Sequence, residues 1–259
     1  MAFRDLMARL GAGNATVDAV LDHPETTPGG SVSGTVTVTG GRIPQDVREV
    51  RVELVATVEV ESGDNTWRED VTFGTTAVGG AFRVEPGEQR RIPFSFRVPL
   101  QCPFTSLDGW RLHGMKVGLR TRVDIPEAVD PGDVDPVEVL PLPVQRTVLQ
   151  ALTARGFSFK GADVEKGRLR GSDLPFYQEV EFAPPRDLRG RVNELEVTFL
   201  ADPQGVEVVL EVDRRGGLLT EGRDVGGRVH VGHADTDVAA VGARLDAAIR
   251  QLGARRGWL

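Results

Sequence analysis

The residues whose types could do chemistry include a histidine pair near the C-terminus. His230 and His233 stand three apart in "RVHVGHAD", and Asp235 and Asp237 follow. Imidazole nitrogens and carboxylate oxygens are ligands of zinc and nickel. Because side chains three apart on a strand point to opposite faces, joint ligation requires a turn at Gly232. We favour the interpretation of two surface histidines before a capped helix, and we keep the metal site as an alternative.

A second candidate is the acidic, proline-rich segment "DIPEAVDPGDVDPVEVLPLP", residues 124–143. Calcium binds several oxygen ligands at close spacing. The segment offers the carboxylates of Asp124, Glu127, Asp130, Asp133 and Asp135. Their spacing lacks the glycine and glutamate positions of an EF-hand loop. A turn in "DPGD" and stiffening by the later prolines explain more of the segment. We predict a rigid connection and keep a calcium site over 124–135 as the alternative.

Cys102 is the only cysteine of the chain, in the context "LQCPFTS". A thiol nucleophile needs an adjacent base, and no histidine or glycine-rich oxyanion element stands beside it. The sequence also contains no GxSxG motif, no GK[ST] phosphate loop and no dinucleotide fingerprint after a strand. We therefore predict a protein that is not an enzyme, with no catalytic residues, no cofactor and no metal. A metal-dependent hydrolase or calcium-bound module using 124–135 or 230–237 is the alternative.

The composition limits the classes of partner. The 259 residues are 40% hydrophobic and 27% charged, an ordinary globular balance, and the net charge is −7. Nucleic-acid binding without sequence preference requires an excess of lysine and arginine, which this chain lacks. The sequence has no run of 18 apolar residues and no apolar stretch typical of a signal peptide. We expect a cytoplasmic protein that binds no nucleic acid.

Apolar and polar residues alternate with period two along most of the chain, which is typical of half-buried strands. In "VREVRVELVATVEVES" the apolar residues from Val50 to Val60 share one face. Similar segments lie before and after the proline-rich segment. Antiparallel sheets with one solvated face produce this pattern. We predict an all-β protein with β-sandwich lobes over 13–140 and 141–259.

Helices are expected at three places. The first covers 1–12 and carries an apolar stripe of Phe3, Leu6, Met7 and Leu10. It docks on a sandwich or makes weak contact with a membrane surface.

The other two helices belong to the second lobe. One covers "VQRTVLQALTARG" and ends at Gly156. The amphipathic C-terminal helix covers "DTDVAAVGARLDAAIRQLG", with Asp235 or Thr236 as the N-cap and Gly253 at its end. Helices of this length more often cover a sheet face than form a coiled coil.

Three tryptophans are candidate anchors for a partner. Trp67 stands next to a turn in "DNTWRED", Trp110 begins a strand after "DG", and Trp258 lies in the tail "ARRGWL". Aromatic side chains at such places are typical of interfaces. With the apolar stripe of residues 1–12, they form the predicted interaction sites. The expected partners are regulatory, cytoskeletal or membrane-associated proteins, and a homodimer is left open.

Several segments, in this order, resemble the SpoOM-type sporulation-control family of the arrestin-like group. They are "PGGSVSGTVTVTGG", "EPGEQRRIPFSFRVP", "LRTRVDIPEAVDPGDVDPVEVLP", "DLPFYQEVEFAP", "LRGRVNELEVTF" and "LEVDRR". The resemblance covers nearly the whole chain. It implies two arrestin-like β-sandwich lobes in a cytoplasmic regulatory protein that acts as a scaffold through protein–protein interaction. No catalytic residues carry over from it, and the buried-charge phosphate sensor of arrestins finds no residue-by-residue match.

Overall fold

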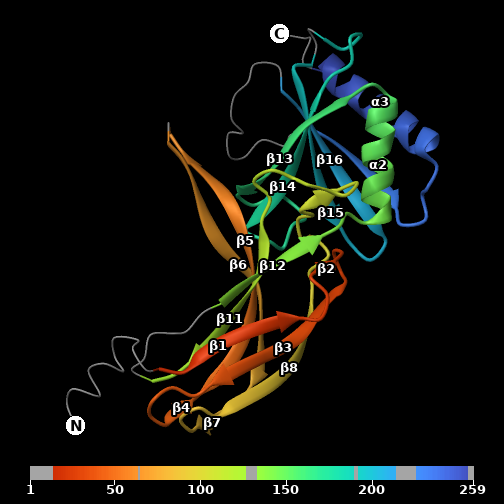
Figure 1. Cartoon of the computed structure of the whole chain (residues 1–259). Helices are drawn as coiled ribbons and strands as arrows, with labels where there is room; N and C mark the ends of the chain where they lie inside the picture. The colour runs from red at the N-terminus through yellow and green to blue at the C-terminus, as the bar shows by residue number, and fades with distance from the viewer. Residues whose placement is uncertain (1–13, 64, 127–132, 190–191, 214–225, 256–259) are drawn as a thin grey trace. The chain divides into compact units, whose positions relative to one another are not determined.

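The computed structural model describes residues 14–63, 65–126, 133–189, 192–213 and 226–255. The chain divides into two compact units, and each is described here by itself (Figure 1). The first unit comprises Met1–Thr57, Asp70–Pro99 and Lys116–Val139, and the second comprises Val58–Glu69, Leu100–Met115 and Leu140–Leu259. The units therefore interleave along the sequence. The lobe boundaries predicted above stay a prediction, and the predicted helix over 1–12 lies outside the described residues.

The first unit contains two main sheets. One has the order β1-β3-β8 and is antiparallel, with strands β1 Thr16–Leu21, β3 Ser31–Thr39 and β8 Gln89–Arg97. The other has the order β5-β11-β12-β2, with β6 also paired to β5. Its strands are β2 Glu25–Thr26, β5 Glu49–Ser62, β6 Asn65–Gly79, β11 Val117–Asp124 and β12 Asp133–Val139. Strands β4 Gln45–Val47 and β7 Phe82–Val84 form a separate pair.

The two main sheets of the first unit face each other across a closely packed core. A Cβ added at Gly74 on β6 would lie 2.8 Å from the ring of Phe96 on β8 and 3.9 Å from Cβ of Leu54 on β5. Val36 and Leu119, from opposite sheets, are fully buried. The alternation in the sequence therefore builds a sandwich here, because each strand places every second side chain between the sheets.

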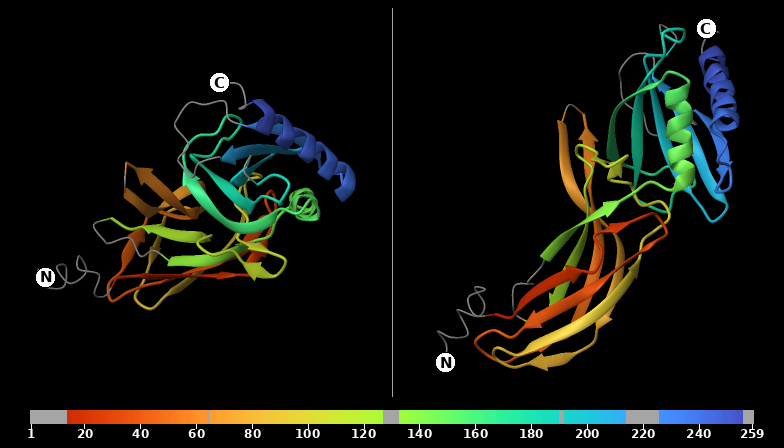
Figure 2. Two further views of the ribbon diagram at one scale, coloured as in Figure 1. Left: turned by 90° about the horizontal axis from the view of Figure 1, so that it is seen from above. Right: turned by 45° about the vertical axis from the view of Figure 1, so that its right-hand side comes forward.

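The second unit is built on an antiparallel meander with the order β17-β16-β15-β14-β13. Its strands are β13 Ser158–Lys166, β14 Phe176–Ala183, β15 Glu194–Ala201, β16 Gly205–Asp213 and β17 Gly227–Gly232. Two helices, α2 Pro143–Ala154 and α3 Val238–Arg255, pack against each other and against these strands. Figure 2 shows both helices on one side of the meander. A short hairpin, β9 Ser106–Leu107 and β10 Trp110–Arg111, also belongs to this unit, as do the parts of β5 and β6 within Val58–Glu69.

The apolar face of the meander packs against the two helices. Leu195 and Leu210 on the strands are fully buried, as are Leu152 on α2 and Leu245 on α3. Gly227 on β17 lies under α3, where an added Cβ would be 3.4 Å from Leu252 and 3.5 Å from Ala248. The predicted all-β class with a C-terminal amphipathic helix is confirmed. Within the described residues, no helix is both long and apolar enough to cross a membrane.

The helix ends agree only in part with the sequence prediction. Gly156 follows α2 with a φ of 89° and donates its N–H to Thr153, so the predicted C-terminal glycine is confirmed. The predicted cap of α3 is wrong, because Oδ1 of Asp237 accepts the N–H groups of Ala239 and Ala240. The predicted end at Gly253 is also wrong, since α3 continues to Arg255.

A buried glutamine holds the 100–115 segment to the meander. On β14, Oε1 of Gln178 accepts the N–H of Phe104 at 3.1 Å, and its Nε2 donates to the Phe104 carbonyl at 2.8 Å. Gln178 is 9% exposed and Phe104 is fully buried. The side-chain amide thus satisfies two backbone groups that have left water, which would be costly if unpaired.

Replacing Gln178 with methionine keeps the volume but removes both hydrogen bonds. We expect Gln178→Met to lower the free energy of unfolding by about 2–4 kcal/mol, because two buried backbone groups lose their partner. Guanidinium denaturation measures this change. The control, Gln204→Met at an exposed turn, should stay within about 0.5 kcal/mol of wild type. A Gln178→Met protein as stable as the control would contradict the interpretation.

Candidate functional site

The histidine and aspartate residues near the C-terminus do not converge. Asp235 accepts the N–H of Gly232 at 3.1 Å and pairs with Arg244 at 3.0 Å, while Nε2 of His233 lies 2.9 Å from the carbonyl oxygen of Asp202. The hydrogen bond from Arg244 also lowers the pKa of Asp235 below its usual value. Among the described residues, 230–237 contribute to no set of three possible ligands within 4.8 Å of one another. The structure therefore gives no support to the predicted metal site there.

The acidic segment is described only at its ends. Asp124 ends β11 opposite Glu49 on β5, and Asp135 lies on β12 opposite Leu119. Glu127 and Asp130, together with the predicted "DPGD" turn, lie largely outside the described residues. The rigid connection and the alternative calcium site over 124–135 both stay predictions.

Cys102 is buried, with 2% of its surface exposed. Desolvation raises the pKa of the Cys102 thiol far above its ordinary value. A thiol of this kind stays protonated at neutral pH and is a poor nucleophile.

Two of the predicted anchors are described and exposed. Trp110 on β10 is 79% exposed and Trp67 on β6 is 45% exposed. Trp258 and the apolar stripe of residues 1–12 lie outside the described residues. Trp110 is thus the most exposed of the large apolar side chains that the structure describes.

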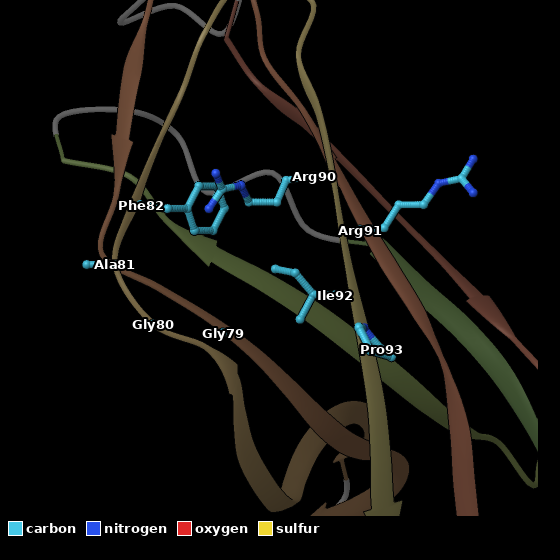
Figure 3. A pocket seen from close by; sticks show the side chains of 8 residues that line it. All are labelled: Gly79, Gly80, Ala81, Phe82, Arg90, Arg91, Ile92 and Pro93. Carbon is cyan, nitrogen blue, oxygen red and sulfur yellow. The ribbon is translucent and has the colours of Figure 1, made fainter.

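The first unit has a shallow hollow of about 460 Å³ between the end of β6 and strand β8. Figure 3 shows the guanidinium of Arg90 over the ring of Phe82, 4.7 Å from its centroid, while Arg91 points away. Gly79, Gly80, Ala81, Ile92 and Pro93 complete the lining. The hollow is open and is lined by two segments, 79–82 and 90–93, that lie close together in the sequence.

Carboxylates gather on the face of the meander that does not meet the helices. Positions alternate along each strand, so the residues between those packed on α2 and α3 point the other way. These positions carry Asp163, Glu165, Glu179, Glu181, Glu196, Glu207 and Glu211. Some of this charge is balanced locally, because Lys160 contacts Glu181 and Glu194, and Arg228 binds Glu207 at 2.8 Å.

The centre of this acidic face is Glu179 with Glu196 and Glu211. One carboxylate oxygen of each lies within 4.8 Å of the others. Glu179 is only 9% exposed. Burial, together with the charges of Glu196 and Asp163, raises the pKa of Glu179 to about 9. Burial and neighbouring carboxylates also raise the pKa of Glu165 to about 7 and that of Asp163 to about 6.

Sequence reasoning missed this cluster. It treated outward-facing acidic residues as solvated, which Glu179 is not. A signal did exist, since glutamates stand two positions apart in "QEVEF" and "ELEV" and four positions apart in "EVVLEV", which places them on one face of each strand. The register between the strands, which brings Glu181, Glu196 and Glu211 into one row, was not available from the pattern.

The comparisons with known proteins agree with one another. The family model described as "SpoOM protein" matches residues 3–216. The chain belongs to this family. The sporulation-control protein Spo0M of Bacillus subtilis (strain 168) is 36% identical over 214 residues, which cover 82% of this chain and 81% of the relative. The crystal structure of Spo0M from Bacillus subtilis superposes with a TM-score of 0.83 at 33% identity, over 93% of this chain and 99% of the other.

The second unit of this chain thus carries a buried carboxylate, Glu179, whose titration should affect stability. The pKa of Glu179 rises from 4.5, its ordinary value, to about 9 in the folded state. Between these two pH values the folded state therefore keeps a proton that the unfolded state has released. Stability should therefore fall as pH rises through this window, by up to about 1.4 kcal/mol per pH unit from this group.

Glu179→Gln removes this titration, so we expect a shallower fall, measured by urea denaturation from pH 5 to 9 with a chelator present. Glu207→Gln, at an exposed ion pair, should keep the wild-type slope. Equal slopes in wild type and Glu179→Gln would show that Glu179 titrates normally.

Proposed function

We propose that this SpoOM-family chain is a non-enzymatic, cytoplasmic regulatory scaffold that acts by binding other proteins. The observation that carries the proposal is Trp110, an aromatic side chain left 79% exposed. Aromatic residues presented in this way are typical anchors of protein interfaces. The relative from Bacillus subtilis is named a sporulation-control protein, which supports a role in regulation for this chain as well.

The local structure around Trp110 favours a preformed contact. Asp108 and Gly109, with φ values of 50° and 83°, make the two-residue turn between β9 and β10. Positive φ at both positions is the type I′ turn that matches strand twist. Ser106 at the base of the hairpin is fully buried. The turn and base thus limit the motion of Trp110, which lowers the entropy lost when a partner binds.

Two further contacts hold the hairpin that carries Trp110. The Gln178 amide holds Phe104, two residues before β9, and Arg146 on α2 approaches Asp108 at 3.9 Å. Arg111 follows Trp110 and is also exposed. Tryptophan and arginine are the residue types most enriched at binding hot spots. Regulatory, cytoskeletal or membrane-associated proteins are the partner classes we propose, and a second copy of the chain is an outcome of the test.

A photoreactive amino acid at position 110 tests the proposal in cells of the source organism. We expect adducts of defined mass at position 110, identified by mass spectrometry, and none at position 20. Val20, 61% exposed, is the matched control because it is exposed and apolar but lies in the first unit. If position 110 gives no more adducts than position 20, the proposal is contradicted.

The same surface can be tested by complementation. Wild type should restore control of sporulation to Bacillus subtilis lacking its own Spo0M, and Trp110→Ala should not. Because Trp110 is largely exposed, Trp110→Ala should keep its free energy of unfolding within about 0.5 kcal/mol of wild type. Full complementation by a stable Trp110→Ala protein would show that the function does not require Trp110.

A further inference from the structure

We propose that Glu179, Glu196 and Glu211 bind one divalent cation of the oxygen-preferring class, with Ca²⁺ the best fit in size. The site lies in the second unit, on the meander face opposite α2 and α3. It is separate from Trp110 and goes beyond the proposed protein-binding function. It also differs from the predicted metal alternatives over 124–135 and 230–237.

The strand register places the three carboxylates. Glu196 on β15 pairs directly with Glu211 on β16, and Glu179 on β14 pairs with Thr198, two residues along β15 from Glu196. Direct and diagonal neighbours on one sheet face are within reach of long side chains. Accordingly, one oxygen from each glutamate lies within 4.8 Å of the other two.

That spacing fits the coordination shell of calcium. Ca²⁺–oxygen bonds of about 2.3–2.6 Å allow two ligand oxygens to be up to about 5 Å apart. Mg²⁺ bonds of about 2.0–2.1 Å allow separations of about 4.2 Å, so calcium accommodates every separation up to the 4.8 Å limit and magnesium only the shorter ones. Carboxylates alone favour calcium, magnesium or manganese over zinc, which prefers nitrogen and sulfur. The strands can therefore hold a calcium-sized ion without changing register.

Independent support comes from Glu179 itself. It is 9% exposed, and its carboxylate has no hydrogen bond or ion pair with any residue in the described part of the chain. Directly opposite on β13, Asp163 has a buried Oδ1 without a hydrogen-bond partner. Burying unpaired carboxylates is costly unless a positive charge or a metal compensates. The buried carboxylate of Glu179, with the unpaired Oδ1 of the half-buried Asp163 opposite it, therefore indicates a site for a cation.

The burial also favours a small ion over a basic peptide. Thr198 and Val209, on the same face beside Glu179, are 5% and 6% exposed. Little of this surface is therefore open to a lysine or arginine side chain of a partner. Glu196 and Glu211 have other interactions, and these are compatible with an ion because a carboxylate has two oxygens and about four lone-pair sites.

Calorimetric titration of the untagged full chain, stripped of metal with a chelator, tests the site with Ca²⁺, Mg²⁺ and Mn²⁺ in turn. We expect one Ca²⁺ per chain and a higher melting temperature when it is bound. Glu179→Gln should weaken binding at least about 10-fold, because it removes a direct ligand and even outer-shell changes cost about that much. Glu207→Gln, on the same face but paired with Arg228, should bind like wild type.

Three results would overturn the site. The first is that none of the three ions shows saturable binding below about 1 mM. The second is that Glu179→Gln and Glu207→Gln lose the same amount of binding affinity. The third is that Glu179→Gln binds as tightly as wild type. The first would show that protons alone neutralise the carboxylates, and the second would show only diffuse attraction. If Glu179→Gln fails to fold, as judged by circular dichroism, Glu196→Gln replaces it with the same expected loss.

Discussion

The structure of the second unit depends on the alternation of side chains along β14, β15 and β16. One set of positions is apolar and is buried under α2 and α3, which supplies the hydrophobic driving force of this unit. The other set of positions, which includes the glutamates, therefore lies on the opposite face of the sheet. Because the strands are antiparallel and in fixed register, glutamates on neighbouring strands become neighbours in space. The acidic cluster is thus a consequence of the packing on the apolar side.

A second constraint links the core to the surface. Segment 100–115 carries the exposed hairpin of β9 and β10, and the Gln178 amide is bonded to both backbone groups of Phe104 within it. The Gln178 amide thus makes the two hydrogen bonds to Phe104 that the backbone of a neighbouring strand would otherwise make. The stability of the sheet therefore contributes to the position of Trp110, so a surface anchor depends on a buried polar residue.

The SpoOM-family relationship and the local chemistry point in the same direction. The match to a solved relative over 93% of the chain establishes the fold. Cys102 is buried and its pKa is raised, and Nε2 of His233 lies 2.9 Å from the carbonyl oxygen of Asp202. What the described surface does offer is an exposed, rigidly held aromatic residue and a group of carboxylates. Both support the binding roles proposed above.

The sequence by itself determined the elements. Period-two alternation identified the strands, the amphipathic pattern identified α3, and Gly156 marked the end of α2, because these signals depend on neighbours along the chain. The "DG" before Trp110 was likewise a local turn signal. The cap of α3 was misplaced from Asp237 to Asp235 or Thr236, since several acceptors stood near the helix start and the bond of Asp235 to Arg244 is a tertiary contact.

Only the tertiary structure decided which carboxylates are buried. Glu179 and Glu207 look alike in the sequence, yet Glu179 is nearly enclosed whereas Glu207 pairs with Arg228 at the surface. Strand register and the neighbours on each side make that difference, and both arise from contacts between segments distant in the chain. For the same reason the two hydrogen bonds between Gln178 and Phe104 had no signature in the sequence. Local patterns specify which residues form a strand, and packing specifies which of them meet.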